Sequence, residues 1–399
     1  MAGLRSKPKQ RLSSDADQLV GQALALSASG SRLEDAFWEG KLSARISQLL
    51  KNGSQASIDA ALDHLYRHNI DAYEALAELS QAMAESITVE HEGAQWQVLL
   101  LACPILAHTR YAIPSGTIKG ELALSLSAHL RAHVLAHDAR IALAPYLYSI
   151  DQLPRNHAEV SSLLGRLSLS AVSGATPKLD LKDLPETAPV LADPRYLLAA
   201  VAVPAGGALY RWQEEGSDYA ERSACLDQWR DQSRPLLSML LPGCEFDLLL
   251  PDAFFISCRE ADRQIRPLTT QSAVNYLQAT LSLSPVGISA VIGSFGEERT
   301  DEYRIAFTAK GDRDVIYGVV WPLYNGEDGK GDIGDRNNPL GQINEHLRAC
   351  GVEDISVHSA LLEPDYCEDC GTPLYVDRAG ELVHAEMPDD APSQQPLFH

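Results

Sequence analysis

The residues of this chain whose types and spacing best suit chemistry lie near its C-terminus. Cys367 and Cys370 form a C-x-x-C-G motif with Gly371, and two thiolates at this spacing fit adjacent corners of a tetrahedral zinc site. Gly371 permits the positive φ that turns the chain away from the metal. The segment after the motif predicts a hairpin that brings His384 back beside the cysteines, and His399 can fold back as the fourth ligand. The pattern therefore predicts a structural Zn²⁺ site made by Cys367, Cys370, His384 and His399.

Two other interpretations of the cysteine pair stay open. A thioredoxin-like redox pair also has the C-x-x-C spacing, but it begins a helix, which Gly371 and Pro373 disfavour here. The cysteines can also be free structural thiols. If zinc binds with four protein ligands, the site is closed, and such sites contribute on the order of 10 kcal/mol to local folding. That is enough to hold a tail with almost no core of its own.

A second set of candidate residues follows three apolar runs that stop at Pro104, Pro204 and Pro322. Ligands of parallel sheets gather beyond the carboxyl ends of the strands, so we expect a pocket among these three loops. An arginine beside an aromatic ring can bind a carboxylate or phosphate and stack on the ring. The alternative is a surface arginine that only shields the aromatic. The candidate ligand-binding residues are His108, Arg110, Tyr111, Tyr210, Arg211, Trp212 and Asn325.

Two further patterns indicate metal binding less strongly. His129, His133 and His137 recur every four residues along one predicted helix face, but no H-E-x-x-H general base accompanies them, which favours a solvated or partly buried face. The glycine- and acid-rich segment 326–335 lacks the ligand spacing of an EF-hand, which favours a mobile loop. The sequence also has no phosphate-binding glycine loop, no dinucleotide fingerprint and no G-x-S-x-G elbow, so it assigns no reaction.

The elements that must position these residues follow a pattern that occurs three times. Each unit has an apolar run that ends at a proline, a polar loop, a helical stretch and a second apolar run that ends at Pro145, Pro251 or Pro364. Such a repeat predicts one supersecondary unit that is copied and packed against itself. Proline-punctuated strand–helix–strand segments are also common enough for coincidence to stay open. We predict three related β-β-α-β units.

The chain divides into six predicted segments of an α+β or α/β protein. A helical N-terminal region precedes the three units, and a small zinc-ribbon-like module follows them. The first unit begins with a hairpin expected to turn at Glu92-Gly93. The expected boundaries are a disordered basic tail at 1–11, helices at 12–87, α/β units at 88–170, 171–262 and 263–364, and the zinc module at 365–399.

Composition and charge restrict the partners. The 399-residue chain has a formal net charge of −21, and such an acidic surface repels phosphate backbones at long range, which disfavours nucleic-acid binding. Its seven cysteines lie mostly isolated in apolar segments, as expected of reduced thiols in the cytoplasm. No run approaches the roughly 18 apolar residues of a membrane span, and the N-terminus does not resemble a signal peptide. We therefore expect a cytoplasmic protein without a membrane partner.

The C-terminal motif also carries a resemblance. The run from Cys367 to Tyr375, together with Gly380 to Pro388, resembles the end of a family of uncharacterised β-proteobacterial proteins, a domain of unknown function. The resemblance extends over most of the chain. It implies a bacterial cytoplasmic setting and no activity, substrate or catalytic residues.

Three functional hypotheses follow from these patterns. The first is a zinc-stabilised, repeat-built protein for binding or assembly, with a protein partner or self-association. The alternative is an enzyme or small-ligand binder with its pocket among the loops after Pro104, Pro204 and Pro322. The third, a nucleic-acid- or ribosome-associated factor, requires a basic patch that the net charge hides.

Overall fold

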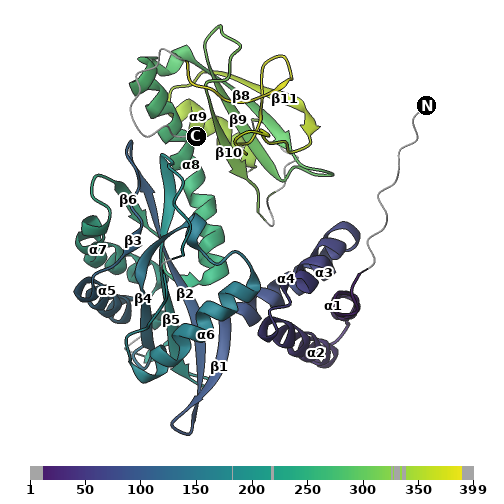
Figure 1. The fold of residues 1–399 in the computed structure, drawn as a ribbon, viewed down its shortest axis with the longest axis vertical. Coiled ribbons are helices and arrows are strands. Elements are labelled where there is room, and N and C mark those ends of the chain that lie inside the picture. The colour runs from purple at the N-terminus through teal and green to yellow at the C-terminus, as the bar shows by residue number, and fades with distance from the viewer. Residues whose placement is uncertain are drawn as a thin grey trace.

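The computed structural model describes residues 12–181, 183–216, 220–324, 327, 333–334 and 338–388. Within these residues the chain forms nine α-helices and two main β-sheets, which gives a mixed α+β architecture. A helical N-terminal bundle lies beside a large sheet, and a smaller sheet lies at the far end of one long helix (Figure 1).

The N-terminal bundle contains α1 (Ser14–Ser27), α2 (Arg32–Lys51), α3 (Gln55–His68) and α4 (Ile70–Glu85). The side chains of Ser13, Ser31 and Asn69 each accept a hydrogen bond from the first turn of the helix that follows, as N-cap residues do. Apolar side chains at helical spacing, such as Leu42 and Ile46 of α2, are buried where the helices meet.

A β-hairpin connects the bundle to the large sheet. β1 (Ser86–His91) and β2 (Ala94–His108) are antiparallel, and the two residues between them, Glu92 and Gly93, have positive φ angles of 51° and 77°. Two residues of this kind form the turn whose twist matches that of paired strands. The turn expected at Glu92-Gly93 is therefore confirmed.

The large sheet has the strand order β1-β2-β5-β4-β3, and β6 and β7 also pair with β2. Its further strands are β3 (Gly116–Thr117), β4 (Arg140–Ser149), β5 (Ala192–Pro204), β6 (Glu245–Leu248) and β7 (Asp252–Ala253). Two helices, α5 (Gly120–His133) and α7 (Arg222–Leu240), connect β2 to β4 and β5 to β6. Because β5 lies between β2 and β4, and β2 lies between β6 and β5, the two β-α-β units interleave in one sheet.

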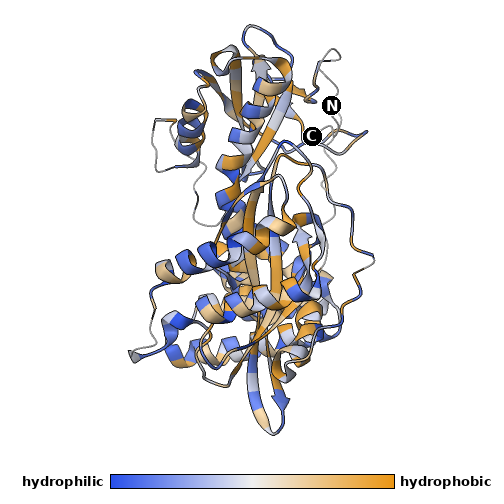
Figure 2. Cartoon of the chain, turned by 90° about the vertical axis from the view of Figure 1, so that its left-hand side faces the viewer, coloured by the Kyte–Doolittle hydropathy of each residue, from blue (hydrophilic) through white to orange (hydrophobic). Residues whose placement is uncertain are grey.

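Helices cover both faces of the large sheet. α5 and α7 lie side by side on one face, where Leu130 and Trp229 are buried. The other face is covered by α6 (His157–Ser173) and by the first half of α8 (Phe254–Leu281). Figure 2 shows apolar strands at the centre and polar helix faces outside, which is the pattern of a sheet buried on both faces.

The long helix α8 joins the two sheets. Phe254 and Ala261 in its first half pack against the large sheet, whereas Ala273 and Leu277 in its second half pack against the smaller one. The helix therefore runs through the boundary that the sequence placed between residues 262 and 263.

The smaller sheet has the order β10-β9-β8-β11. Its strands are β8 (Ile288–Phe295), β9 (Glu302–Ala309), β10 (Tyr317–Pro322) and β11 (Asp354–Leu362). α8 and α9 (Pro339–Ala349) cover one face, and a hairpin of β12 (Tyr375–Val376) and β13 (Leu382–Val383) covers the other. Short 3₁₀ helices are also present at Ile150–Gln152, Arg211–Gln213 and Pro285–Gly287.

The prediction that proline ends the apolar runs is wrong for Pro104 and Pro145, which lie inside β2 and β4. Pro104 occupies the point where β2 changes partner, between Ala102, which pairs with β7, and Ile105, which pairs with β6. A strand can lack an amide hydrogen where its hydrogen-bond ladder is interrupted. Pro145 lies where the pairing of β4 with β5 shifts register, which is the kind of irregularity that accommodates a proline.

The repeat of three equivalent units is not confirmed. The first two units interleave in one sheet, and the third forms a separate sheet with a different strand order. The coarser expectation of a mixed α and β protein holds. In the described part of the chain, no helix has the length and apolar character needed to cross a membrane.

Candidate metal centre and ligand cavity

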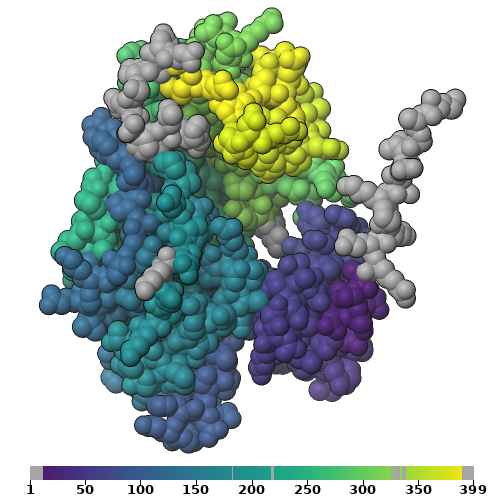
Figure 3. All heavy atoms as spheres, in the orientation of Figure 1, coloured from purple at the N-terminus to yellow at the C-terminus, as the bar shows by residue number. Residues whose placement is uncertain are grey.

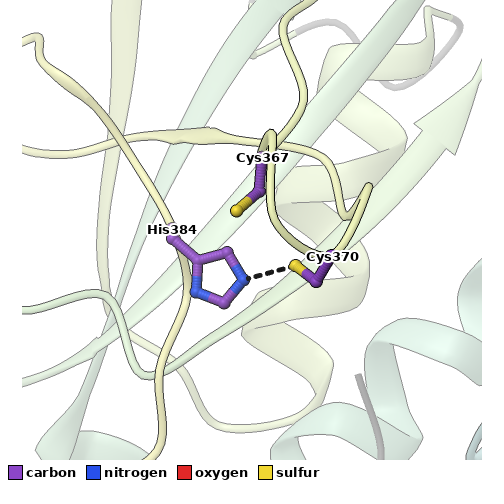
Figure 4. A group of neighbouring side chains, drawn as sticks. All are labelled: Cys367, Cys370 and His384. Atoms are coloured by element: carbon purple, nitrogen blue, oxygen red, sulfur yellow. Dashed lines mark hydrogen bonds between the residues drawn. The ribbon is translucent and has the colours of Figure 1, made fainter.

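Three side chains near the C-terminus converge on one point (Figure 4). The Sγ atoms of Cys367 and Cys370 and a ring nitrogen of His384 all lie within 4.8 Å of one another. The Nε2 atom of His384 lies 3.2 Å from Sγ of Cys370. The edge of a tetrahedron built on zinc bonds of about 2.1–2.3 Å is roughly 3.6 Å, so the group is near the size that zinc requires.

The cysteine turn is formed by the backbone. The Cys367 N–H donates to the Thr372 carbonyl at 2.8 Å, and the Gly371 N–H donates to the Cys367 carbonyl at 2.9 Å. Gly371 has a φ of 73°, a conformation that glycine adopts without strain. The residues around the pair form a turn and not the first turn of a helix, which a thioredoxin-like redox pair requires.

The surroundings of Cys370 favour its thiolate, the form that binds a metal ion. Hydrogen bonds from Thr372, and then from His384, lower the pKa of Cys370 to about 7. The Thr372 hydroxyl lies 2.8 Å from Sγ of Cys370 and 2.9 Å from Nε2 of His384. The other ring nitrogen of His384 lies 3.2 Å from a carboxylate oxygen of Glu386, the position from which a carboxylate commonly orients a metal-bound histidine.

A buried arginine holds the two ends of the cysteine loop, which we define as residues 365–374. Arg304 of β9 is fully buried, and its Nη1 donates to the carbonyls of Asp365 and Leu374 at 2.7 Å each. Its Nε donates to the Glu302 carboxylate at 2.6 Å. The guanidinium group therefore closes the base of the loop from which both cysteines extend.

The hairpin after the cysteine loop packs directly on the smaller sheet. A Cβ atom on Gly318 of β10 would lie 2.1 Å from the Tyr375 ring, and one on Gly293 of β8 would lie 2.5 Å from the Val376 side chain. Glycine at these strand positions therefore permits the close approach of the hairpin. In the space-filling view the C-terminal residues, in yellow, form one block on the surface (Figure 3).

An apolar cavity of about 600 Å³ adjoins the group formed by Cys367, Cys370 and His384. His384 lines it together with Ile316, Val319 and Met387. The cavity also reaches residues 190–192 at the start of β5, so it lies near the place where the two sheets meet.

A second cavity, of about 680 Å³, contains three of the predicted ligand-binding residues. His108, Arg110 and Tyr111 line it, at the end of β2 and opposite the second half of α8. The Nε2 atom of His108 lies 3.7 Å from a carboxylate oxygen of Glu245 on β6. The guanidinium of Arg110 lies 5.4 Å from the centre of the Tyr111 ring. We call this cavity the β2-end cavity.

Three other predicted residues, Tyr210, Arg211 and Trp212, do not reach the β2-end cavity. They follow β5, which is antiparallel to β2, so that His108 lies opposite the first residue of β5 and Pro204 lies opposite Trp96. The twelve residue steps between these pairs correspond to about 40 Å of strand. The loops after Pro104 and Pro204 therefore lie too far apart to share a pocket. The expectation of a shared pocket required parallel strands, whose carboxyl ends lie at the same edge of a sheet.

The residues after β5 have structural contacts instead. The Tyr210 hydroxyl donates to Asp252 at 2.9 Å, and the rings of Tyr210 and Trp212 stack with their centres 4.3 Å apart. Burial raises the pKa of Tyr210. The Arg211 guanidinium donates to the Ala132 carbonyl near the end of α5. These contacts close the end of the sheet opposite the β2-end cavity.

Several predicted residues give no additional site. Asn325 and His399 lie outside the described residues, as does most of segment 326–335. The rings of His129 and His133 stack at 5.7 Å, and burial and the neighbouring His133 lower the pKa of His129. Within the described residues, the cysteine pair with His384 is the one group of three side chains placed to hold a metal ion.

Sequence reasoning missed two buried arginines that position the loops, Arg304 and Arg195. Arg304 lies inside the apolar run of β9, and Arg195 lies near the start of the apolar strand β5. A charged residue in a strand that is otherwise apolar on both faces is unusual, because burying an unpaired charge is costly. That pattern could have identified both residues.

Comparison with known protein families identifies the family to which the chain belongs. A family model described as "Protein of unknown function (DUF2863)" matches residues 4–398. The chain belongs to this family. The DUF2863 match spans nearly the whole chain, so it includes both sheets and the metal group. The predicted resemblance is confirmed as membership of a family of unknown function, and its bacterial range stays a prediction. No curated protein and no solved structure matches the chain.

Proposed function

We propose that the C-terminal module is a structural zinc centre that fastens the end of the chain to the smaller sheet. The observation that carries this proposal is the convergence of two thiols and one imidazole within 4.8 Å. Cysteine and histidine ligands are typical of structural zinc. The buried Arg304 and the glycine-dependent packing of Tyr375 and Val376 support a structural role, because both fix the module against β8, β9 and β10.

We assign the fourth ligand to His399, which lies twelve residues after Met387 and follows an acidic and proline-containing stretch. Four protein ligands leave no open position for a substrate or water, and this is the reason for assigning the centre a structural and not a catalytic role. Zinc would supply a cross-link between the cysteine loop, the hairpin and the end of the chain.

Metal analysis of the purified chain tests this proposal. We expect about one zinc per chain, loss of the zinc in Cys370→Ser, and retention in Cys350→Ser, which removes a thiol outside the group. His399→Ala should keep zinc with lower affinity, since three ligands remain. A parent protein purified without chelators that holds no zinc, or holds another metal, overturns the assignment.

For the whole chain we propose a cytoplasmic role in binding or assembly, with a protein partner or a second copy of the chain. The separation of Tyr210, Arg211 and Trp212 from the β2-end cavity supports this role over an enzyme whose pocket unites all the predicted loops. The net charge of −21 disfavours nucleic acid as the partner. Native mass spectrometry tests the role, because it reports the oligomeric state, the metal content and any co-purified molecule together. A monomer that captures no partner under native conditions contradicts assembly.

A second candidate function is small-ligand binding, and one specific observation favours it. His108, Arg110 and Tyr111 were each singled out as ligand-binding types, and all three line a single cavity of about 680 Å³. This volume lies within the roughly 300–1,000 Å³ range of small-molecule sites. A co-purified small molecule that is lost when Ala279→Trp, at an exposed position of α8, fills the cavity is the expected result, and a chain that never retains one contradicts this function.

A further inference from the structure

We infer that the β2-end cavity binds a small organic acid that has one carboxylate and further hydrogen-bonding groups, with Arg110 as the carboxylate ligand. This inference rests on the second candidate function, and it names the ligand class. Three properties of the cavity support it: a loop held in place by hydrogen bonds, one cation without a carboxylate partner, and a wall with side-chain amides that are free to bind a ligand.

The loop that presents Arg110 is held rigidly. We define this cavity loop as residues 109–118. The buried Arg195 donates from Nε to the Pro114 carbonyl and from Nη2 to the Ile113 carbonyl, both at 2.8 Å, and it also pairs with Asp193. The Thr109 hydroxyl donates to the Gly243 carbonyl at 2.8 Å. A loop fixed at its start and centre loses little conformational entropy when a ligand binds.

Arg110 is the one uncompensated cation of the cavity. Among the described residues it has no carboxylate partner, and its guanidinium contacts only the Tyr111 ring. The other charged wall residue, Glu245, faces His108 at 3.7 Å and is largely exposed. One free guanidinium matches one carboxylate through two parallel hydrogen bonds. The Glu245 carboxylate opposes a second negative charge, so the cavity favours a monoanion over a polyphosphate.

The opposite wall is a polar face of α8. Gln271 and Asn275 are one helical turn apart and both line the cavity, and Ser272 and Thr280 lie on the same wall. Within the described chain, the side-chain amides of Gln271 and Asn275 make no hydrogen bond, and both residues are exposed. Each amide offers both donors and an acceptor to a ligand. These groups suit hydroxyl, carbonyl or amine substituents next to the carboxylate, as in a hydroxy, oxo or amino acid.

The direct test measures binding of L-lactate to the full-length chain by calorimetry and by saturation-transfer NMR. Arg110→Gln should weaken lactate binding at least about tenfold, because a charge-assisted hydrogen-bonded pair is lost. The matched control, Arg67→Gln, removes the same charge from an exposed position on α3 and should leave binding unchanged. Thermal melting of all variants checks that each remains folded.

A second variant tests the amide wall. Acetate has the carboxylate of lactate but no hydroxyl, so the parent chain should bind lactate more tightly than acetate. Asn275→Ala should reduce or abolish this preference while acetate binding stays the same. An unchanged preference overturns the role of the amide wall.

Two further probes separate the ligand class from the existence of the site. If glycerol binds as tightly as lactate and Arg110→Gln has no effect, the acid inference fails and the small-ligand function stands. If inorganic phosphate binds more tightly than lactate through Arg110, the monoanion class is overturned. If no probe binds, the acid inference fails. The co-purification experiment with Ala279→Trp then decides the small-ligand function independently.

Discussion

The cysteine loop and the cavity loop are each held by a buried arginine, but the side chains that they expose differ in chemistry. Arg304 of β9 holds the two ends of the cysteine loop, and Arg195 of β5 holds the centre of the cavity loop, in both cases through backbone carbonyls. Both guanidinium groups are fully buried. The comparison teaches that a strand arginine fixes the backbone of a loop, whereas the side chains the loop presents decide what it binds. One loop directs thiols to a common point, and the other presents an unpaired cation to a cavity.

Removal of either buried arginine should give the largest effect and should break the comparison most directly. Arg304→Met or Arg195→Met leaves the carboxylate of Glu302 or Asp193 unpaired, which costs about 3–5 kcal/mol of unfolding free energy. Denaturant unfolding measures this loss, and hydrogen exchange locates it. Each variant should increase exchange in its own loop. Arg67→Met, on the surface of α3, should do neither.

Equal exchange increases in both loops for either arginine variant would contradict independent anchoring. In that case the two loops would belong to one cooperative unit, and the increased exchange would result from global unfolding.

The next effect concerns pH and lies outside both loops. Burial raises the pKa of Glu85 to about 7, from 4.5, although the Phe255 N–H at the start of α8 donates to its carboxylate. Between these values the unfolded chain has lost a proton that the folded chain keeps, so the unfolding free energy falls as pH rises from about 5 to 8. Glu85→Gln should reduce this slope and stabilise the chain by up to about 3 kcal/mol at pH 8, whereas Asp193, whose pKa burial also raises to about 7, keeps its own contribution. Glu78→Gln, an exposed change on the same helix, is the control.

This pH prediction sharpens the comparison because it separates a global response from a loop response. Glu85→Gln should leave hydrogen exchange in the cysteine loop and the cavity loop unchanged relative to global stability. A pH slope that is the same in Glu85→Gln and the parent chain contradicts the assignment to this carboxyl.

The close contact between Gly318 and the Tyr375 ring predicts an effect on the cysteine loop and its hairpin, but none on the cavity loop. Gly318→Ala places a methyl group against the Tyr375 ring and should cost about 1–3 kcal/mol, because the hairpin must move away from the sheet. Thermal unfolding and zinc retention should both decrease, whereas lactate binding should stay. Gly165→Ala, in open space within α6, should be neutral or slightly stabilising. A tolerated Gly318→Ala contradicts close packing of the module.

A last pair of variants distinguishes the chemistry of the two loops, and the Arg110 variant should have the smallest effect on stability. Arg110→Gln should change the unfolding free energy by less than about 0.5 kcal/mol, as expected of an exposed position, and should keep zinc. Cys370→Ser should lose zinc and increase hydrogen exchange in the cysteine loop, but it should keep lactate binding. Loss of both properties in either variant shows that the loops are coupled.

Local patterns in the sequence predicted more of this structure than long-range patterns did. The Glu92-Gly93 turn and the placement of His384 beside the cysteines follow from residues close together in the chain. His108, Arg110 and Tyr111 line the same cavity because they lie within four residues of one another in the chain, and their role as ligand-binding residues stays a prediction.

Strand direction was the main property that the sequence could not supply. An apolar run does not indicate whether its neighbour is parallel or antiparallel, and the antiparallel pairing of β2 with β5 separates Arg211 from Arg110. Proline was also misread as an end signal at Pro104, because the strand partners change at that point. The arginines that anchor the loops depend on tertiary contacts, so only their unusual apolar surroundings are visible in the sequence.

Because α8 is shared by the two sheets, it restricts where the protein can be cut into folded fragments. The helix has 28 residues and a length of about 42 Å, and its two halves complete the hydrophobic cores of different sheets. A cut before residue 268 or after residue 273 removes part of the helix from the core that it covers, and only a cut between these residues leaves each core with its own segment. We therefore expect a fragment that ends before Phe254, or one that begins after Leu281, to lose solubility, because each lacks the helix segment that covers its sheet.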